Sequence, residues 1–256
     1  MIKDFFRQAY ASITDFEFYP RIVDQSFRKT LFFLLFLAGF TALVTTILVG
    51  FQILPEVSGF FKWAEQEFPP FHIRDGIMTV DADQPFFCSY NPGEPVTFVF
   101  DTTGTYTSPE PLKEPALLLT DDQLFILLGG QTQAYSWKDF VSLEIHNGNL
   151  NNYRRVVILL FFPIAYSSYL LWSLFYIPLF ALLLSPISRF AGLTFGVRFP
   201  LQKTFTIALY SQIPATVIDL AVQATGLNIS YFILIYFAIS AIYTYLATQK
   251  CSLIDT

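Results

Sequence analysis

One uncharged apolar run constrains the fold of this chain more than any other feature of its sequence. Residues 31–54 read LFFLLFLAGFTALVTTILVGFQIL, and no Asp, Glu, Lys or Arg interrupts them. A helix of this length rises about 36 Å, which is enough to cross a hydrocarbon core of about 30 Å with some tilt. The run is longer than the apolar part of a secretory signal, and no small-x-small cleavage site follows it. We therefore expect a membrane anchor that is retained.

Three further apolar runs occur in the carboxyl-terminal part of the chain, at 156–184, 204–224 and 229–248. Pro163 and Pro178 interrupt the first of them, and we expect one kinked helix there because neighbouring helices can satisfy freed carbonyls. Only 225–228 separates the last two runs, which predicts an antiparallel hairpin. The composition agrees with several spans, since 54% of the residues are apolar and only 14% are charged.

Basic residues outside 55–155 predict the direction of the spans. They lie in the amino-terminal segment, in the loop before the third run and in the tail: Lys3, Arg7, Arg21, Arg28, Lys29, Arg189, Arg198, Lys203 and Lys250. Because basic residues collect on the cytoplasmic side, both termini are predicted to be cytoplasmic and 55–155 extracytoplasmic, in the cell membrane. Arg154 and Arg155 run slightly against this rule and are expected to snorkel to outer headgroups or to end the folded domain.

The predicted division has eight parts. It comprises a cytoplasmic or interfacial segment at 1–30, transmembrane helices at 31–54, 156–184, 204–224 and 229–248, the extracytoplasmic domain at 55–155, a loop at 185–203 and a tail at 249–256. Residues 5–29 alternate aromatic and charged side chains, which fits either an interfacial helix on the inner leaflet or a short helix packed under the bundle.

The segment 55–155 differs sharply in charge from the rest of the chain. It holds 14 of the 20 acids but 6 of the 15 bases, a net charge of −8, while the remainder carries 9 bases and 6 acids. A formal net charge of −5 argues against nucleic acid as a partner, because nucleic-acid binding needs a basic face.

Period-two patterns in this segment predict strands. Residues 71–74 and 77–80 flank Asp75-Gly76, a dipeptide that favours a two-residue hairpin turn. Further strands are expected at 96–101 and in a second hairpin, 116–119 with 124–128. The sequence SWKD from Ser136 resembles a helix cap, and a helix is expected from about Trp137 towards Asn149.

The expected fold is thus an α-helical bundle of four transmembrane helices with an inserted small extracytoplasmic α+β domain, mostly of antiparallel β-strands. The order of these segments resembles a family of uncharacterised bacterial membrane proteins with a domain of unknown function. The matching features are Phe18-Tyr19-Pro20, the segments IRDGIMTV (73–80), FVFDTTG (98–104) and LLLTDDQLFI (117–126), and the three closing spans. Some members are labelled maltodextrin utilisation proteins, so the resemblance implies an association with carbohydrate uptake but no catalytic residue.

Two groups of residues could carry chemistry. Asp101, Thr102, Thr103 and Gly104 are similar to the Asp-Thr-Gly loop of aspartic proteases, with one extra threonine. Catalysis by such a loop needs two carboxylates that share a proton, and this sequence holds no second copy. We therefore interpret these residues as a strand followed by a turn, with Asp101 accepting bonds from backbone amides.

The second group lies in the third run. Asp219 is the acid inside a span, where a carboxylate costs about 2.5–3.5 kcal/mol at mid-bilayer. Gln212 and Ser211 could line a polar seam with it on the same helix. A functional intramembrane site and a residue near the interface that bonds a neighbouring Tyr or Gln both remain open.

The remaining reactive residue types give no further site. Cys88 and Cys251 are predicted on opposite sides of the membrane, and His72 and His146 have no second ligand at metal spacing. No nucleophile triad or phosphate-binding loop occurs. We expect no enzyme, cofactor or metal.

Three functions follow in order of preference. The first is a non-enzymatic accessory, sensor or partner-binding protein, whose partners are the lipid bilayer and another membrane protein such as a transporter. The second is a homo-oligomeric transporter or channel for small solutes that uses the polar face of the third span. The third is a hydrolase on the outer face that uses Asp101.

Overall fold

The computed structural model describes residues 2–91, 93, 95–112, 115–140, 145–227 and 229–253. The chain divides into two compact units. We call residues 1–51 with 161–256 the helical unit, and residues 52–160 the strand unit.

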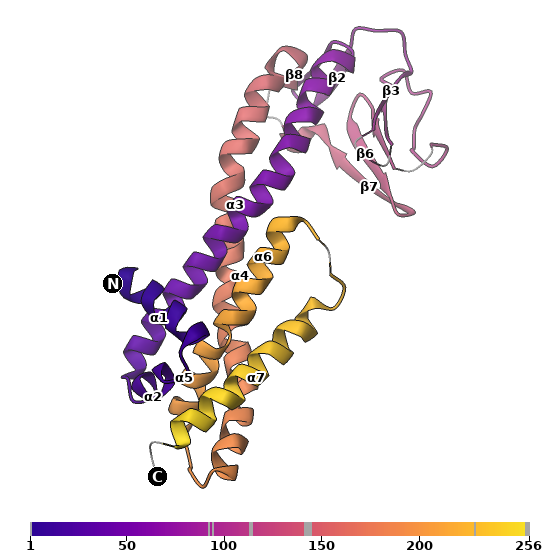
Figure 1. Cartoon of the computed structure of the whole chain (residues 1–256). Helices are drawn as coiled ribbons and strands as arrows, with labels where there is room; N and C mark the ends of the chain where they lie inside the picture. Colours follow the sequence, from indigo (N-terminus) through magenta and orange to yellow (C-terminus); the bar gives the residue numbers. More distant parts are fainter. Residues whose placement is uncertain are drawn as a thin grey trace. The chain divides into compact units, whose positions relative to one another are not determined.

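Four helical stretches are long and apolar enough to cross a membrane (Figure 1). They are α3 (Phe27–Glu67), α4 (Leu150–Thr194), α5 with α6 (Leu201–Ser211 and Ile213–Thr225) and α7 (Phe232–Ser252). The number of long apolar helices and their order along the chain therefore agree with the sequence prediction.

The first two long helices exceed their predicted bounds. Helix α3 has 41 residues and runs past Leu54 through Pro55 to Glu67. Helix α4 has 45 residues and contains Pro163, Pro178 and Pro186 without being divided. At 1.5 Å per residue both helices are about 60 Å or longer, roughly twice the hydrocarbon thickness of a bilayer. Part of each helix must therefore lie outside any membrane that it crosses.

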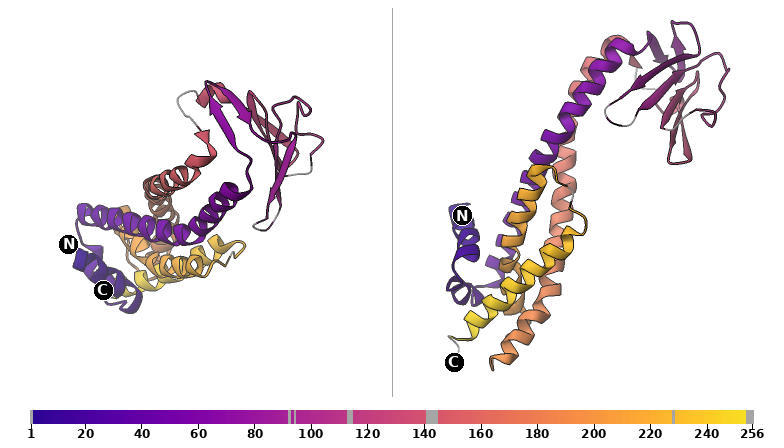
Figure 2. Two further views of the ribbon diagram at one scale, coloured as in Figure 1. Left: turned by 90° about the horizontal axis from the view of Figure 1, so that it is seen from above. Right: turned by 45° about the vertical axis from the view of Figure 1, so that its right-hand side comes forward.

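The third apolar stretch, predicted as a span at 204–224, is a candidate span from Leu201 to Thr225 with one interruption at Gln212. Helix α5 ends at Ser211, and α6 begins at Ile213. Helix α6 ends at Thr225, followed by Gly226 in the left-handed conformation with a φ of 70°. The two views of Figure 2 show α6 and α7 running side by side in opposite directions, as expected for the hairpin.

Two short helices precede the first span. Helix α1 (Ile2–Thr14) packs against α5 and α6, and α2 (Phe18–Val23) packs against α5 and α7. Phe5 of α1 is buried, and its ring lies 5.2 Å from the ring of Phe33 in α3. Ile2 and Phe6 lie on the same face of α1 as Phe5 but remain largely exposed. The segment is thus packed on the bundle through an apolar face that is only partly covered.

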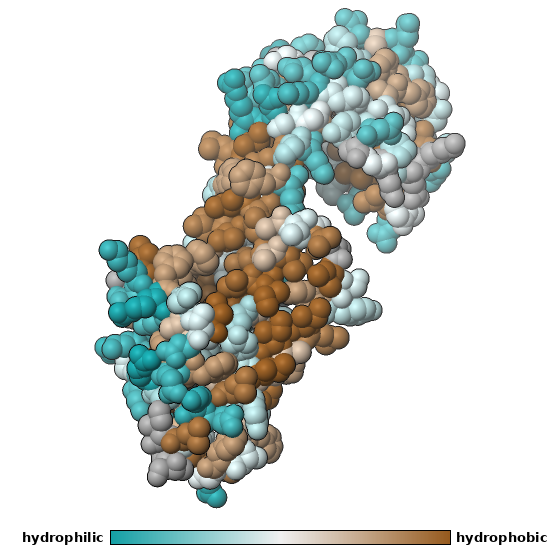
Figure 3. All heavy atoms as spheres, in the orientation of Figure 1, coloured by the Kyte–Doolittle hydropathy of each residue, from teal (hydrophilic) through white to brown (hydrophobic). Residues whose placement is uncertain are grey.

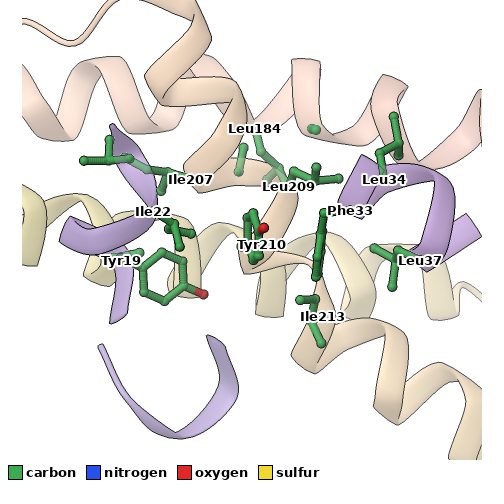
Figure 4. Close-up of a cluster of buried hydrophobic side chains, with 14 of the residues drawn as sticks. Tyr19, Ile22, Phe33, Leu34, Leu37, Leu184, Ile207, Leu209, Tyr210 and Ile213 are labelled. Atoms are coloured by element: carbon green, nitrogen blue, oxygen red, sulfur yellow. The ribbon is translucent and has the colours of Figure 1, made fainter. Parts of the chain in front are cut away.

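The core of the helical unit lies where α2, α3, α4 and α5 meet (Figure 4). Its centre is Tyr210, whose ring stacks on Phe33 with the ring centroids 4.0 Å apart. The Tyr210 hydroxyl donates to Gln8 Oε1 at 2.8 Å and accepts from Gln25 Nε2 at 3.2 Å. Aromatic stacking and a satisfied hydroxyl allow a tyrosine to be fully buried here.

The strand unit contains two sheets. Strands β1 (Phe71–Arg74), β2 (Ile77–Val80) and β8 (Ile145–His146) form the first, in the order β2-β1-β8. Strands β3 (Phe86–Tyr90), β4 (Val96–Phe100), β5 (Ala116–Leu119), β6 (Gln123–Leu128) and β7 (Gln131–Ser136) form the second in sequence order. All neighbouring pairs are antiparallel except β4 and β5, which are parallel.

Both predicted hairpins are present. In the β1–β2 hairpin Phe71 faces Val80, and both turn residues, Asp75 and Gly76, have positive φ. This is the turn type that matches strand twist. A Cβ on Gly76 would lie 2.7 Å from Lys138 Cγ, so a larger residue would also meet the neighbouring segment. Strands β5 and β6 pair around the Thr-Asp-Asp turn.

The core of the strand unit is aromatic. Phe98 and Phe100 of β4 and Phe71 of β1 are buried together with Trp137. The carboxyl-terminal end of α3 closes this core, because Phe60 and Trp63 pack against the same cluster. The continuation of α3 past Pro55 therefore supplies part of the hydrophobic core on which the sheet folds.

The expectation of a helix from Trp137 towards Asn149 is wrong. The chain forms one short 3₁₀ helix at Trp137–Phe140 and another at Asn147–Asn149, after β8. Residues 141–144 lie outside the described part. Trp137 Nε1 donates to Thr120 O at 2.9 Å, and its amide donates to Asp122 O at 2.9 Å. Tertiary bonds to the β5–β6 turn and the pairing of β8 with β1 thus override the local helix signal.

Candidate functional site

The third apolar stretch contains a polar residue, Gln212, at the point where α5 ends and α6 begins. Pro214 is the second residue of α6, where its missing N–H is tolerated, but inside a continuous helix its ring would clash with the carbonyl of Tyr210. The Gln212 amide instead donates to Leu209 O at 3.4 Å, closing a tighter turn. The chain therefore leaves one helix and starts the next at Gln212.

The Gln212 side chain joins three helices at this break. Its Nε2 donates to Ile177 O of α4 at 3.3 Å and to Ala208 O of α5 at 3.4 Å. Its Oε1 accepts a bond from the Tyr236 hydroxyl of α7 at 3.3 Å. Gln212 is fully buried. Its bond to Ala208 O satisfies a carbonyl that the interrupted helix leaves without its usual partner.

Thr216 and Tyr236 complete this group, which we call the break cluster (Gln212, Thr216 and Tyr236). The two hydroxyl oxygens lie 3.0 Å apart, and the Thr216 hydroxyl also bonds to Gln212 O at 3.0 Å. All three residues are buried. Both polar side-chain atoms of Gln212 have partners, and the hydrogen bonds of the cluster connect α4, α6 and α7.

The other two residues predicted for the polar seam point elsewhere. Ser211 is fully buried, and its Oγ has no hydrogen bond of ordinary geometry to a described residue. It lies beside the hydroxyl of Tyr19 in α2; burial raises the pKa of Tyr19, and the Ser211 hydroxyl opposes part of that rise. Asp219 is half-buried, and its Oδ2 accepts a bond from Gln223 Nε2 at 2.9 Å, one turn along α6.

The structure thus joins Gln212 to two residues that the sequence did not single out. Thr216 lies one turn after Gln212, a spacing that places both on one face of a helix. Tyr236 lies in the uncharged fourth run, where a tyrosine needs a partner for its hydroxyl once it is buried. That requirement is the sequence signal that could have paired Tyr236 with Gln212.

Asp101 organises the beginning of the β4–β5 connection. It is fully buried, and its Oδ1 accepts bonds from Thr103 N at 2.9 Å and Thr103 Oγ1 at 2.6 Å. Its Oδ2 accepts a bond from Tyr106 N at 2.5 Å. Burial raises the pKa of Asp101, but the hydrogen bonds from Thr103, Tyr106 and Gly104 outweigh it, so the net direction is downward.

The neighbours of Asp101 complete the same turn. Thr102 N and Thr102 Oγ1 both donate to Gln84 Oε1, at 2.6 and 2.9 Å. Gly104 has a φ of 80°, a conformation that favours glycine. Because both carboxylate oxygens of Asp101 already accept bonds from the turn, the geometry is that of a structural aspartate.

Strand β7 forms an edge of the five-stranded sheet. Within the described residues it pairs with β6 alone, across the two-residue turn Gly129-Gly130, whose φ values are 58° and 73°. Residues 131–135 are exposed, and the strand carries no charge and no proline. Natural edge strands are usually protected by charges, proline or bulges, so an unprotected edge is available for pairing.

Reactive thiols and metal ligands form no site among the described residues. Cys88 is half-buried on β3, and burial together with the carboxylate of Glu67 raises its pKa to about 11. Cys251 is buried at the end of α7. No group of three or more potential metal-ligating His, Cys, Asp or Glu residues occurs in the part of the chain that the structure describes.

Comparison with known proteins identifies one family. The model of the family described as "Protein of unknown function (DUF1189)" matches residues 6–248. Neither the curated proteins nor the solved structures contain a match to this chain. Because the family model covers nearly the whole sequence, the chain belongs to this family, in agreement with the resemblance seen in its motifs.

Proposed function

We propose that this chain is a multi-pass protein of the cell membrane that binds a partner protein outside the cytoplasm and performs no catalysis itself. Both termini lie in the cytoplasm, and residues 55–155 face outward. The free edge of β7 is the element that binds, and the partner is another membrane protein, such as a transporter. The observation that carries this proposal is the unprotected, exposed edge of β7.

The distribution of side chains supports the membrane placement. Large apolar residues cover the outside of the helical unit, among them Leu171, Phe190 and Leu234 with exposed fractions of 70%, 72% and 65%. In the view of Figure 3 apolar residues gather over the helices, whereas the region of the strands shows hydrophilic and apolar residues mixed. An apolar patch of this extent is unusual on a soluble monomer and marks contact with lipid or protein.

Ion pairs support the orientation. Lys203 at the start of α5 pairs with Asp24 at 2.6 Å, and Lys250 at the end of α7 pairs with Glu17. The amino-terminal segment, the start of α5 and the end of α7 therefore meet at one end of the helical unit. The nine basic residues outside 55–155 belong to these segments, to the loop before α5 or to the last two turns of α4. Such an end is cytoplasmic by the positive-inside rule.

The register of β7 supports edge recognition. The Trp137 amide bonds back to Asp122 O, and alternate residues of a strand point their backbone groups in opposite directions. The amides of Gln133 and Tyr135 accordingly face β6, while those of Thr132 and Ala134 face away from it. An extended segment of a partner can add to such an edge through main-chain hydrogen bonds.

A matched pair of variants at Ala134 tests the proposal. Ala134→Pro removes an outward amide and leaves the β6 ladder intact, whereas Ala134→Ser keeps that amide and serves as the control. We expect affinity purification from native membranes, after crosslinking, to recover a stable partner with the wild-type chain and Ala134→Ser but not with Ala134→Pro. Repeated recovery of the chain alone, or equal recovery with both variants, would contradict edge binding.

The broken third span favours one alternative. Discontinuous helices line substrate sites in several transporter folds, so an oligomer of this chain could carry a small solute past Gln212 and Asp219. Flux in reconstituted vesicles, compared between the wild type, Gln212→Leu and Asp219→Asn, tests this function. Unchanged flux in both variants excludes the two side chains from transport.

A further inference from the structure

A second binding surface lies in the helical unit, where α1 packs beside the amino-terminal half of α3 (Figure 1). A cavity of about 420 Å³ opens there. Its polar lining consists of Asp4, Arg7, Gln8 and Lys29. Two cations against one carboxylate give this opening a surplus of positive charge. Arg7 pairs with Asp4 at 3.1 Å, and the side chains of both are largely exposed.

An apolar groove of about 570 Å³ continues from this cavity. The two hollows share Phe5, Phe32 and Phe36, so they are adjoining parts of one surface. Beyond the shared residues the groove is lined by Ile2, Phe6, Leu35, Gly39, Phe40, Leu43 and Tyr166. One end of the combined surface is therefore cationic, and the rest is apolar.

The length of the groove matches one leaflet of a bilayer. From Phe32 to Leu43 helix α3 advances about 16 Å at 1.5 Å per residue. Half of a hydrocarbon core of about 30 Å is about 15 Å. Lys29 precedes the apolar run of α3, at the level where phospholipid headgroups would lie.

We propose that this surface binds one phospholipid with an anionic headgroup from the cytoplasmic leaflet. Arg7 and Lys29 bind its phosphate, Gln8 adds a hydrogen bond, and an acyl chain lies along the aromatic groove between α1 and α3. Basic pockets between helices on the cytoplasmic side are suited to such headgroups. This inference rests on the proposed membrane placement but is independent of partner binding at β7.

The headgroup contacts are tested by titrating the purified full-length chain with phosphatidylglycerol and with phosphatidylcholine, followed by native mass spectrometry. We expect tighter binding of phosphatidylglycerol. Each cation near an anionic headgroup contributes about fivefold in affinity, so R7Q/K29Q should weaken phosphatidylglycerol binding about thirtyfold. The matched control R28Q/R198Q removes two exposed cations that do not line the cavity, and it should bind as the wild type does.

The tail contacts are tested at Gly39. A Cβ at this position would meet only Tyr166 Oη, at 3.7 Å, so Gly39→Ala fits and serves as the control. Gly39→Leu fills the groove and should weaken phosphatidylglycerol binding by a factor comparable to that of the charge variant. Glycerophosphoglycerol, the headgroup without acyl chains, should not compete.

Several outcomes would overturn the proposal. They are equal affinity for the two lipids, equal losses in R7Q/K29Q and R28Q/R198Q, and competition by the free headgroup, which would indicate a phosphate site without a lipid. R7K/K29R keeps both charges and should retain the preference, so a folding defect in the glutamine variant can be distinguished from lost recognition. Failure of the wild-type chain to insert into nanodiscs of either lipid would instead contradict the membrane placement itself.

Discussion

The helical unit and the strand unit distribute polar and apolar side chains in opposite ways between their interior and their surface. In the helical unit, threonine and serine residues such as Thr206, Thr244 and Ser188 are fully buried while large aliphatic and aromatic side chains are exposed. In the strand unit, phenylalanine and tryptophan fill the interior. Among its described residues, only Asp101 and Thr120 are buried polar residues.

The buried polar groups of the two units also bond differently. In the helical unit some of them join separate helices, as in Ser188 with Thr248 at 2.8 Å and Thr30 with Thr206 at 3.1 Å, while others, such as Thr244, bond to a carbonyl of their own helix. In the strand unit Asp101 and Thr120 bond within their own turns. Lipid cannot drive apolar helices together as water does, so packing and interhelical bonds carry that role. This contrast is what the proposed membrane placement predicts, with the helical unit in lipid and the strand unit in water.

A cavity made in the core of the strand unit should therefore cause the largest loss of folding stability. Phe100 is fully buried among Phe68, Phe71 and Phe86, and Phe100→Ala should cost about 3–5 kcal/mol because transfer energy is lost and a void remains. Limited proteolysis of the full chain in detergent would show faster cleavage within 52–160. Phe87→Ala, at an exposed position on β3, is the control. Equal sensitivity of the two variants to protease would contradict a hydrophobic core that forms in water.

Replacing Asp101 should give the next largest loss of folding stability, and this loss should depend on pH. Asp101→Asn weakens the charge-assisted bonds from Thr103 and Tyr106 and should cost about 2 kcal/mol at pH 7. Because the folded pKa is lower than the unfolded value of about 3.9, this stability is fully present above about pH 4 and is lost as the pH falls through the folded pKa. Proteolysis rates compared from neutral to acid pH, with exposed Asp121→Asn as control, would reveal it. A pH-independent difference would mean that the charge of Asp101 is irrelevant.

The break cluster should give the smallest effect. Interhelical hydrogen bonds in a membrane average about 0.6 kcal/mol, so Gln212→Leu should cost about 1 kcal/mol although the residue is fully buried. A double-mutant cycle with Tyr236→Phe, followed by unfolding in detergent, measures the coupling between the two side chains. A loss of unfolding free energy above about 3 kcal/mol in Gln212→Leu would be typical of a core that forms in water, and it would contradict the contrast between the two units.

Sequence patterns identify the elements that are governed by local chemistry. The apolar runs mark all four long helices because an uncharged helix of that length has few other uses, and Asp75-Gly76 marks its hairpin because both positions need positive φ. Strand β7 carries no such signal, since an edge strand exposed on both faces shows no alternation of apolar and polar residues. The 3₁₀ turn at Trp137 is equally hidden because distant bonds to Thr120 and Asp122 determine it.

The candidate site is harder to predict than the fold. Gln212 and Asp219 stand out as polar residues in an apolar run, but the side chains that bond them depend on which helices are neighbours. Tyr236 comes from a different span, and Ile177 contributes only its carbonyl, which no sequence pattern reveals. Pro214 indicates an interruption, but the sequence does not reveal that Gln212 bonds to neighbouring helices at that point.

Cysteine labelling in intact cells tests the central claim, that the strand unit faces the outer solution and the basic end of the helical unit faces the cytoplasm. In a Cys88→Ser/Cys251→Ser background, Thr105→Cys in the strand unit and Ser26→Cys before α3 each introduce one exposed thiol. A membrane-impermeant maleimide should label Thr105→Cys in intact cells, and Ser26→Cys only after permeabilisation. Labelling of Ser26→Cys in intact cells with protection of Thr105→Cys would contradict the account.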